Sequence, residues 1–145
     1  MLFSKSFYFT RLRKESIRLD SNDLKGTIPT ELGLLFYLRE LRLTINDFYG
    51  SIPSQLGNLH LLNDLRIGGN NFTGSSIPSE IGNCGSLKFL GLTFAGLEGT
   101  IPPELFHAKR LEWISLGTNK LTGTMPRTIG QLKRAKLSKS NIFAY

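Results

Sequence analysis

The stretch "GSIPSQLGNL" at residues 50–59 is one copy of a phrase that recurs along this chain of 145 residues. It occurs first as "GTIPTELGLL" at residues 26–35. It returns as "SIPSEIGNC" at residues 76–84, "GTIPPELFHA" at residues 99–108 and "GTMPRTIGQL" at residues 123–132. Self-similarity at a fixed period of this size is typical of a solenoid, in which each repeat stacks on its neighbours.

Alignment on the proline divides the chain into five units of nearly constant length. They begin at residues 17, 41, 65, 90 and 114, with spacings of 24, 24, 25 and 24, and the extra residue lies where "TGSSIP" replaces the "YGSIP" pattern. Seven positions in a unit are apolar, and in the second unit these are Leu41, Leu43, Phe48, Ile52, Leu56, Leu59 and Leu62. Because one unit cannot bury this set alone, we expect the columns to stack into a continuous core.

Each unit opens with two apolar residues spaced by two, which predicts a short strand with both side chains on one face. An asparagine follows the strand, where its side chain can bond backbone groups as the chain leaves the sheet. These predicted stack residues are Asn22, Asn46, Asn70 and Asn119, with Ala95 in the fourth unit. The glycine and the Ile-Pro or Met-Pro pair predict a bend and an extended segment, and the "ELG" and "QLG" segments predict short helical turns on the convex side.

The unit "LRLTINDFYGSIPSQLGNLHLLND" resembles the plant-specific class of leucine-rich repeat. Such repeats occur in ectodomains of plant receptor-like kinases and receptor-like proteins and in related secreted inhibitors. The resemblance covers residues 17–135 and implies an α/β repeat fold, a right-handed solenoid of about five 24-residue repeats. It also implies a concave parallel β-sheet and a second sheet formed by the "GxIP" segments.

Three segments follow from this reading: a divergent N-terminal flank at 1–16, the leucine-rich repeat domain at 17–137 and a divergent C-terminal tail at 138–145. Family ectodomains usually begin with a signal peptide and a cysteine-containing cap. The chain shows no apolar run of the length of a signal peptide or a membrane helix, and its single cysteine excludes an internal disulfide. We therefore expect a truncated or partial relative.

The net charge of +7 comes from the two flanks. Residues 17–132 carry ten basic and ten acidic side chains. The first 16 residues carry four basic and one acidic, and residues 133–145 carry four basic. Because a nucleic-acid-binding domain usually spreads its basic residues over one folded face, this distribution argues against a nucleic-acid partner.

Catalytic and cofactor signatures are absent from the sequence. It contains no kinase elements, no GxSxG elbow, no HExxH pair and no phosphate-binding loop, so we expect neither an enzyme nor a cofactor or metal. Cys84 falls in an apolar column and is predicted to be a buried core residue. His60 and His107 lie on convex segments without ligand spacing.

The tripeptide Asn71-Phe72-Thr73 is the only N-glycosylation sequon in the chain. It makes Asn71 a candidate glycosylation site. An equally weighted reading is one more asparagine in an asparagine-rich turn.

A candidate ligand-binding surface follows from the outward-pointing strand positions. One column places arginines side by side, and its neighbour carries acidic residues in the first half and aromatics in the second, which predicts a solvated ion network beside exposed rings. Exposed aromatics beside arginine resemble the anchors of binding surfaces. The predicted residues are Arg18, Glu40, Arg42, Asp64, Arg66, Phe89, Phe94 and Trp113.

These features favour a non-catalytic recognition module that binds a peptide, a glycan or a protein on the concave face, with a co-receptor as a further candidate partner. The resemblance implies a role in signalling or defence at the plasma membrane or outside the cell. One alternative is a secreted inhibitor of microbial cell-wall-degrading enzymes, similar to polygalacturonase inhibitors. Another is a fragment without independent function.

Overall fold

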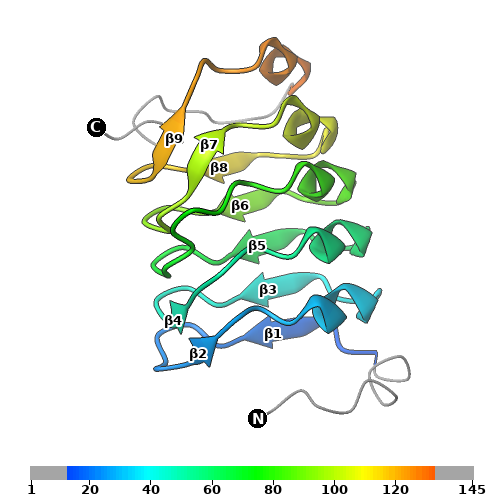
Figure 1. Cartoon of the computed structure of the whole chain (residues 1–145). Helices are drawn as coiled ribbons and strands as arrows, with labels where there is room; N and C mark the ends of the chain where they lie inside the picture. The colour runs from blue at the N-terminus through cyan, green and yellow to red at the C-terminus, as the bar shows by residue number, and fades with distance from the viewer. Residues whose placement is uncertain (1–12, 133–145) are drawn as a thin grey trace.

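The computed structural model describes residues 13–132. Most of the predicted N-terminal flank, the last five residues of the predicted repeat domain and the C-terminal tail lie outside the described residues. Figure 1 shows the described chain as a stack of coils, each with a short strand on one side and a short helix on the other. The predicted leucine-rich repeat solenoid is confirmed.

A five-stranded parallel sheet, here called the larger sheet, runs along the stack with one strand in each coil (Figure 1). Its strands, in spatial order, are β1 (Ser16–Arg18), β3 (Glu40–Arg42), β5 (Asp64–Arg66), β6 (Phe89–Gly91) and β8 (Trp113–Ser115). The register pairs Leu41 with Leu65 and Leu65 with Leu90. Equivalent repeat positions are therefore direct neighbours, as the period predicts.

The second sheet is interrupted in the third coil. Its pairs are β2 (Lys25–Gly26) with β4 (Asp47–Phe48), and β7 (Glu98–Thr100) with β9 (Lys120–Thr122). Between them the third coil contributes only a single bridge residue, Asn71, opposite Tyr49. The extra residue of "TGSSIP" follows this bridge, so the continuous second sheet implied by the repeats is replaced by two separate pairs and a turn.

The predicted helical turns are 3-10 helices, stacked on the side away from the larger sheet (Figure 1). They are η2 (Thr30–Leu34), η3 (Ser54–Asn58), η4 (Ser79–Asn83), η5 (Pro103–His107) and η6 (Arg127–Gln131). Each follows a proline whose φ near −65° is fixed by its ring. At five residues each, they are slightly longer than the runs of three or four residues that 3-10 geometry usually reaches.

Apolar columns fill the space between the sheets and the 3-10 helices. Leu41, Leu65 and Leu90 are fully buried, whereas the exposed fraction of Leu19 in the first described coil is 36%. Cys84 is also fully buried, and its thiol donates a hydrogen bond of 3.3 Å to the carbonyl of Leu56. Burial raises the pKa of Cys84 to about 12, so its thiol stays protonated at neutral pH.

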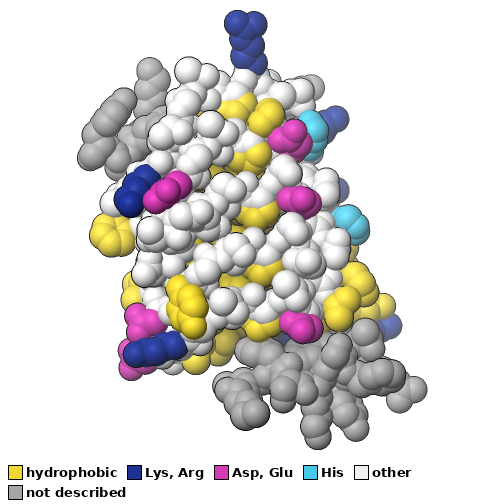
Figure 2. Space-filling view, viewed as in Figure 1, with side chains coloured by type: hydrophobic (Ala, Val, Ile, Leu, Met, Phe, Trp, Pro, Cys, Tyr) yellow, Lys and Arg dark blue, Asp and Glu magenta, His cyan; other side chains and the backbone are white. Residues whose placement is uncertain are grey.

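The outer surface of the described residues offers no single charged patch in the view of Figure 2. Acidic and basic side chains are scattered there, singly or in pairs, between uncharged atoms. Among residues 13–132, no helix combines the length and the apolar character needed to cross a membrane.

Asparagine side chains tie successive coils together. The amide nitrogen of Asn46 donates to the carbonyls of Leu43 at 3.0 Å and of Leu19, in the preceding coil, at 2.9 Å. Its amide oxygen accepts from the backbone N–H of Leu24 at 3.2 Å. Asn70 and Asn119 repeat this pattern one and three coils later.

In the fourth coil Ala95 occupies the asparagine column, and a backbone carbonyl takes the place of the asparagine side chain as hydrogen-bond acceptor. The N–H of Phe72 donates to the carbonyl of Ala95 at 2.8 Å. In the equivalent positions of other coils, this N–H donates to the side-chain oxygen of an asparagine. Gly96, directly after this carbonyl, has a positive φ of 71°, which the equivalent residues of the other described coils do not have. A local change of backbone conformation therefore replaces the missing side chain.

We predict that Asn46→Ala lowers the free energy of unfolding by about 1 to 3 kcal/mol, because it removes the side-chain hydrogen bonds to the preceding coil and leaves the backbone N–H of Leu24 without a partner among residues 13–132. Chemical unfolding by urea, followed by circular dichroism, measures the change. Asn22→Ala is the matched control, since Asn22 is exposed and bonds only carbonyls of its own coil. Equal losses for the two variants would contradict the role of the inter-coil hydrogen bonds.

A second prediction concerns the distance between the 3-10 helices. A Cβ atom on Gly57 would overlap the backbone carbonyl of Glu80 in the next coil. Gly57→Ala should therefore push two coils apart and destabilise the protein by about 1 to 3 kcal/mol. Gly85→Ala, where a Cβ would meet nothing within 4 Å, should be neutral or slightly stabilising in the same unfolding experiment.

Candidate functional site

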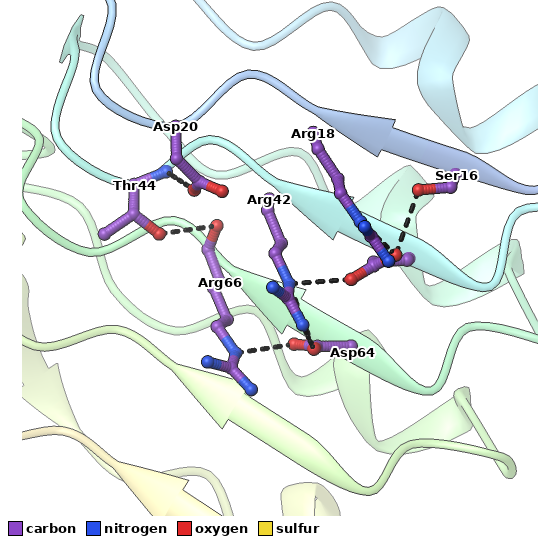
Figure 3. Close-up of polar contacts among 8 residues, drawn as sticks. Ser16, Arg18, Asp20, Arg42, Thr44, Asp64 and Arg66 are labelled. Carbon is purple, nitrogen blue, oxygen red and sulfur yellow. Dashed lines mark hydrogen bonds and ion pairs between the residues drawn. The ribbon is translucent and has the colours of Figure 1, made fainter.

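A ladder of alternating charges crosses the first three strands of the larger sheet (Figure 3). Its members, here called the charge ladder, are Arg18, Glu40, Arg42, Asp64 and Arg66. Nε of Arg18 and Nε of Arg42 lie 2.6 and 2.7 Å from the two carboxylate oxygens of Glu40. Nη2 of Arg42 and Nε of Arg66 lie 2.7 and 2.8 Å from those of Asp64. Each carboxylate thus bridges two arginines that would otherwise repel one another.

The two carboxylates of the charge ladder are buried, which corrects the prediction of a solvated ion network. Asp64 is 4% exposed and Glu40 is 9% exposed. The apolar stems of arginine can lie over a surface while the charged head reaches water. Removing one arginine would leave a buried carboxylate with a single arginine partner, which costs more than the loss of an exposed ion pair.

The pKa values of two ladder members, Glu40 and Arg42, are shifted toward their charged forms. Burial alone would raise the pKa of Glu40, but hydrogen bonds from Arg18 and Ser16, together with the charges of Arg42 and Arg18, outweigh it. The pKa of Glu40 therefore lies below its ordinary value. The hydrogen bond to Asp64 raises the pKa of Arg42 further above neutrality. Both shifts favour the ionised forms of these two side chains.

Two aromatic rings continue the charge ladder across the last two strands. The register places Phe89 beside Asp64, and Trp113 beside Phe89. The guanidinium carbon of Arg66 lies 5.7 Å from the centre of the Phe89 ring and 5.5 Å from that of Trp113. Both distances are within the range of cation–π attraction. Arg66 is therefore held between a carboxylate on one side and two ring faces on the other.

A hollow of about 350 Å³ lies over the larger sheet beside this arginine. Its wall includes Arg42, Arg66, Gly68, Gly91, Thr93 and Trp113. The glycines create the space, because a Cβ on Gly91 would come within 3.3 Å of the Arg66 side chain and 3.4 Å of the Trp113 ring. The sequence predicted both charged and aromatic walls but missed the small residues between them. In the sequence, Gly91 replaces the arginine of the column formed by Arg18, Arg42 and Arg66, whereas Gly68 stands in a different column, with Thr44 and Thr93.

The structure places Phe94 away from the other predicted residues. Its side chain, 67% exposed, lines a second hollow of about 620 Å³ together with Ile45, Gly69 and Asn71. We call this the lateral hollow, because it lies where the chain leaves the strands of the larger sheet. Ile45 and Phe94 have φ angles of 57° and 58°, which side chains of this size rarely adopt. The conformation turns both outward, on either side of Gly69.

Groups able to hold a metal are not gathered within the described residues. His60 and His107 are exposed on the outer segments, and His60 bonds the carbonyl of Asn83 at 3.1 Å. Every buried side-chain nitrogen or oxygen in this part of the chain has a hydrogen-bond partner. The arrangement suits recognition of a ligand by charge and by stacking.

We predict that the charge ladder makes stability fall in acid. Because the pKa of Glu40 is lower in the folded state than in the unfolded chain, its contribution is complete above the unfolded pKa and is lost as the pH falls through the folded one. The free energy of unfolding, measured by urea titration between about pH 6 and pH 2, should fall less steeply for Glu40→Gln than for the wild type. Parallel curves would show that Glu40 makes no such contribution.

No family model and no curated protein sequence matches the chain. Solved structures of plant receptors match the chain. A chain of the BIR3–SERK2 complex from Arabidopsis thaliana matches with a TM-score of 0.80 and 37% identity, over 90% of this chain and 67% of that one. A chain of the Arabidopsis receptor kinase HAESA structure, with the peptide hormone IDA and the co-receptor SERK1, matches with a TM-score of 0.78 and 39% identity, over 81% of this chain and 20% of that one.

A TDR receptor structure gives a TM-score of 0.83 and 35% identity, over 89% of this chain and 22% of that one. The chain thus spans two thirds of the first of these structures and about a fifth of the other two. The likeness extends over nearly all of the five in-register repeats. The chain belongs to the plant leucine-rich repeat family whose members include the ectodomains of receptor kinases.

Proposed function

We propose that the chain is a non-catalytic recognition module that binds an extended peptide on the larger sheet, at the outer surface of the plasma membrane. The observation that carries the proposal is the position of Arg66. Its guanidinium lies against two aromatic rings at the wall of an open hollow. A charged group that is already oriented loses little freedom when a ligand binds.

Arg66 can take up an acidic group of the ligand. Among residues 13–132, its only side-chain hydrogen bond runs from Nε to Asp64, so both Nη groups remain for a ligand. The charge ladder holds three arginines against two carboxylates, which leaves one positive charge in excess. Planar guanidinium pairs well with carboxylate, and the neighbouring rings exclude water from one side of the pair.

Trp113 provides the apolar part of the same site. Its ring is half-buried and borders the hollow that Gly68 and Gly91 keep open. Tryptophan and arginine are enriched among the residues that dominate binding energy at interfaces, and the tryptophan ring offers a large contact area with only two rotatable bonds. We therefore expect a ligand with an acidic group and an apolar side chain close together, lying across β5, β6 and β8.

The similar structures support a peptide as the first ligand to test. The HAESA structure contains a peptide hormone and a co-receptor, and the BIR3–SERK2 structure is a complex of two proteins. A peptide on the larger sheet with a second protein beside it is therefore the arrangement we propose for this chain. The buried thiol of Cys84 and the exposed, separate histidines argue against a catalytic role.

We predict that binding depends on the larger sheet. In a calorimetric or interferometric screen of synthetic peptides and oligosaccharides, Trp113→Ala and Arg66→Gln should each weaken a ligand by about 2 kcal/mol, roughly thirtyfold in Kd. Gly91→Val should weaken it as well by filling the hollow without removing a contact. Its φ lies outside the left-handed region, so the backbone accepts a side chain.

The control is His60→Ala on the outer surface, which should bind like the wild type. Each variant is first checked for a native circular dichroism spectrum at the temperature of the binding assay. A ligand weakened by His60→Ala but not by folded Trp113→Ala or Gly91→Val would place the site elsewhere. Inhibition of microbial polygalacturonases in the absence of any peptide ligand would favour the inhibitor alternative.

A further inference from the structure

Among the described residues, the amide nitrogen of Asn71 has no hydrogen-bond partner, unlike those of its neighbours in the asparagine stack. Asn46, Asn70 and Asn119 each donate through Nδ2 to three backbone carbonyls. Within residues 13–132, Nδ2 of Asn71 donates no hydrogen bond, and the residue is exposed. A group attached to this nitrogen would therefore disturb none of the described hydrogen bonds that join the coils.

The residues after Asn71 form a turn that projects from the solenoid. Phe72 is fully buried and anchors the turn, and its carbonyl accepts from the N–H of Ser75 at 2.9 Å. Gly74, at the third position, has the positive φ of 80° that a type II turn requires. The hydroxyl of Thr73 donates to the amide oxygen of Asn71 at 2.6 Å, which leaves the amide nitrogen toward solvent.

The extra residue of the third coil explains why this turn exists only here among the described coils. In the other coils the corresponding segment pairs with a neighbour in the second sheet, as Lys25 pairs with Asp47 and Glu98 with Lys120. In the third coil the pairing stops at the Asn71 bridge. The sequon therefore sits in the one gap of the second sheet within residues 13–132.

From this geometry we infer that Asn71 is an N-glycosylation site and that its glycan covers the lateral hollow. In the modification, Nδ2 of Asn71 forms a bond to C1 of the sugar, and the bond from C1 to the diphosphate of a lipid-linked oligosaccharide donor breaks. The lipid diphosphate leaves, and one proton of Nδ2 passes to the base of the host transferase. No oxidation or reduction takes place. The threonine two residues after the asparagine meets the transferase's requirement.

The lateral hollow lies directly beside this attachment point. Asn71 forms part of its wall together with Ile45 and Phe94, whose exposed fractions are 61% and 67%. Large exposed apolar residues invite association with other chains. A glycan on Asn71 would shield them. The inference rests on the proposed extracellular location and not on any ligand.

The test is translation of the full chain, fused to a cleavable leader, in the presence of endoplasmic reticulum microsomes. Only protease-protected chains are scored. We expect the wild type to gain the mass of one oligosaccharide and to lose it on treatment with endoglycosidase H. Asn71→Gln and Thr73→Val should abolish the mass shift, and Thr73→Ser should retain it.

A relocated sequon provides the matched control. In the Asn71→Gln background, the substitution His60→Thr completes an acceptor that begins at Asn58, which is exposed on the outer surface, and it should restore one glycan. A protected wild-type chain without the mass shift would overturn the inference, as would a shift that survives Asn71→Gln alone. The leader directs the chain into the microsomes, so this test does not depend on ligand binding. A negative glycosylation result would therefore leave the peptide-binding proposal unaffected.

A second experiment tests whether the glycan on Asn71 covers the lateral hollow. Hydroxyl-radical footprinting, read by mass spectrometry, should show lower oxidation of Phe94 in the glycosylated wild type than in Asn71→Gln. The glycan on Asn58 should give no such protection. Equal oxidation of Phe94 in all three proteins would show that the glycan points away, and would overturn that part of the inference.

Discussion

A coil of this solenoid can bury its apolar side chains only against the coils above and below it. Leu43 and Ile67 are 3% and 0% exposed, whereas the equivalent Leu19 in the first described coil is 36% exposed. The same dependence explains the glycine column of the 3-10 helices, where a single Cβ on Gly57 would meet the next coil's backbone. Stability is therefore shared between neighbours and is not a property of any one repeat.

The candidate binding surface follows from this stacking. Parallel strands about 4.8 Å apart bring every repeat position into a column, so three arginines at one position become neighbours. Their repulsion is relieved because Glu40 and Asp64 occupy the adjacent column and reach both ways. The carboxylates are buried as a consequence, and the last arginine turns its face toward Phe89 and Trp113. The same five charges thus join the strands and form part of the proposed binding surface.

Each local departure from the repeat sequence changes the structure in its own way. Ala95 removes an asparagine, and the backbone carbonyl of the same residue replaces it. The extra residue of the third coil breaks the second sheet and produces the turn that carries Asn71. Gly68 and Gly91 open the hollow beside Arg66. Each change affects only the nearest coils, as expected of a chain whose contacts are mostly between neighbours.

The sequence by itself determined the period, the apolar columns, the strand positions and the family. These properties depend on the identity of residues at regular spacing, and five copies in register leave little freedom. The positions of the charged and aromatic columns could be predicted for the same reason.

Only the tertiary structure decided how those columns are used. It buried Glu40 and Asp64, separated Phe94 from Trp113, and left the amide nitrogen of Asn71 without a partner among the described residues. It also interrupted the second sheet. The physical reason is that burial and hydrogen bonding depend on which rotamers fit between coils about 4.8 Å apart, and on backbone angles such as the positive φ of Phe94. A repeat pattern specifies which residues become neighbours, whereas packing decides which way they turn.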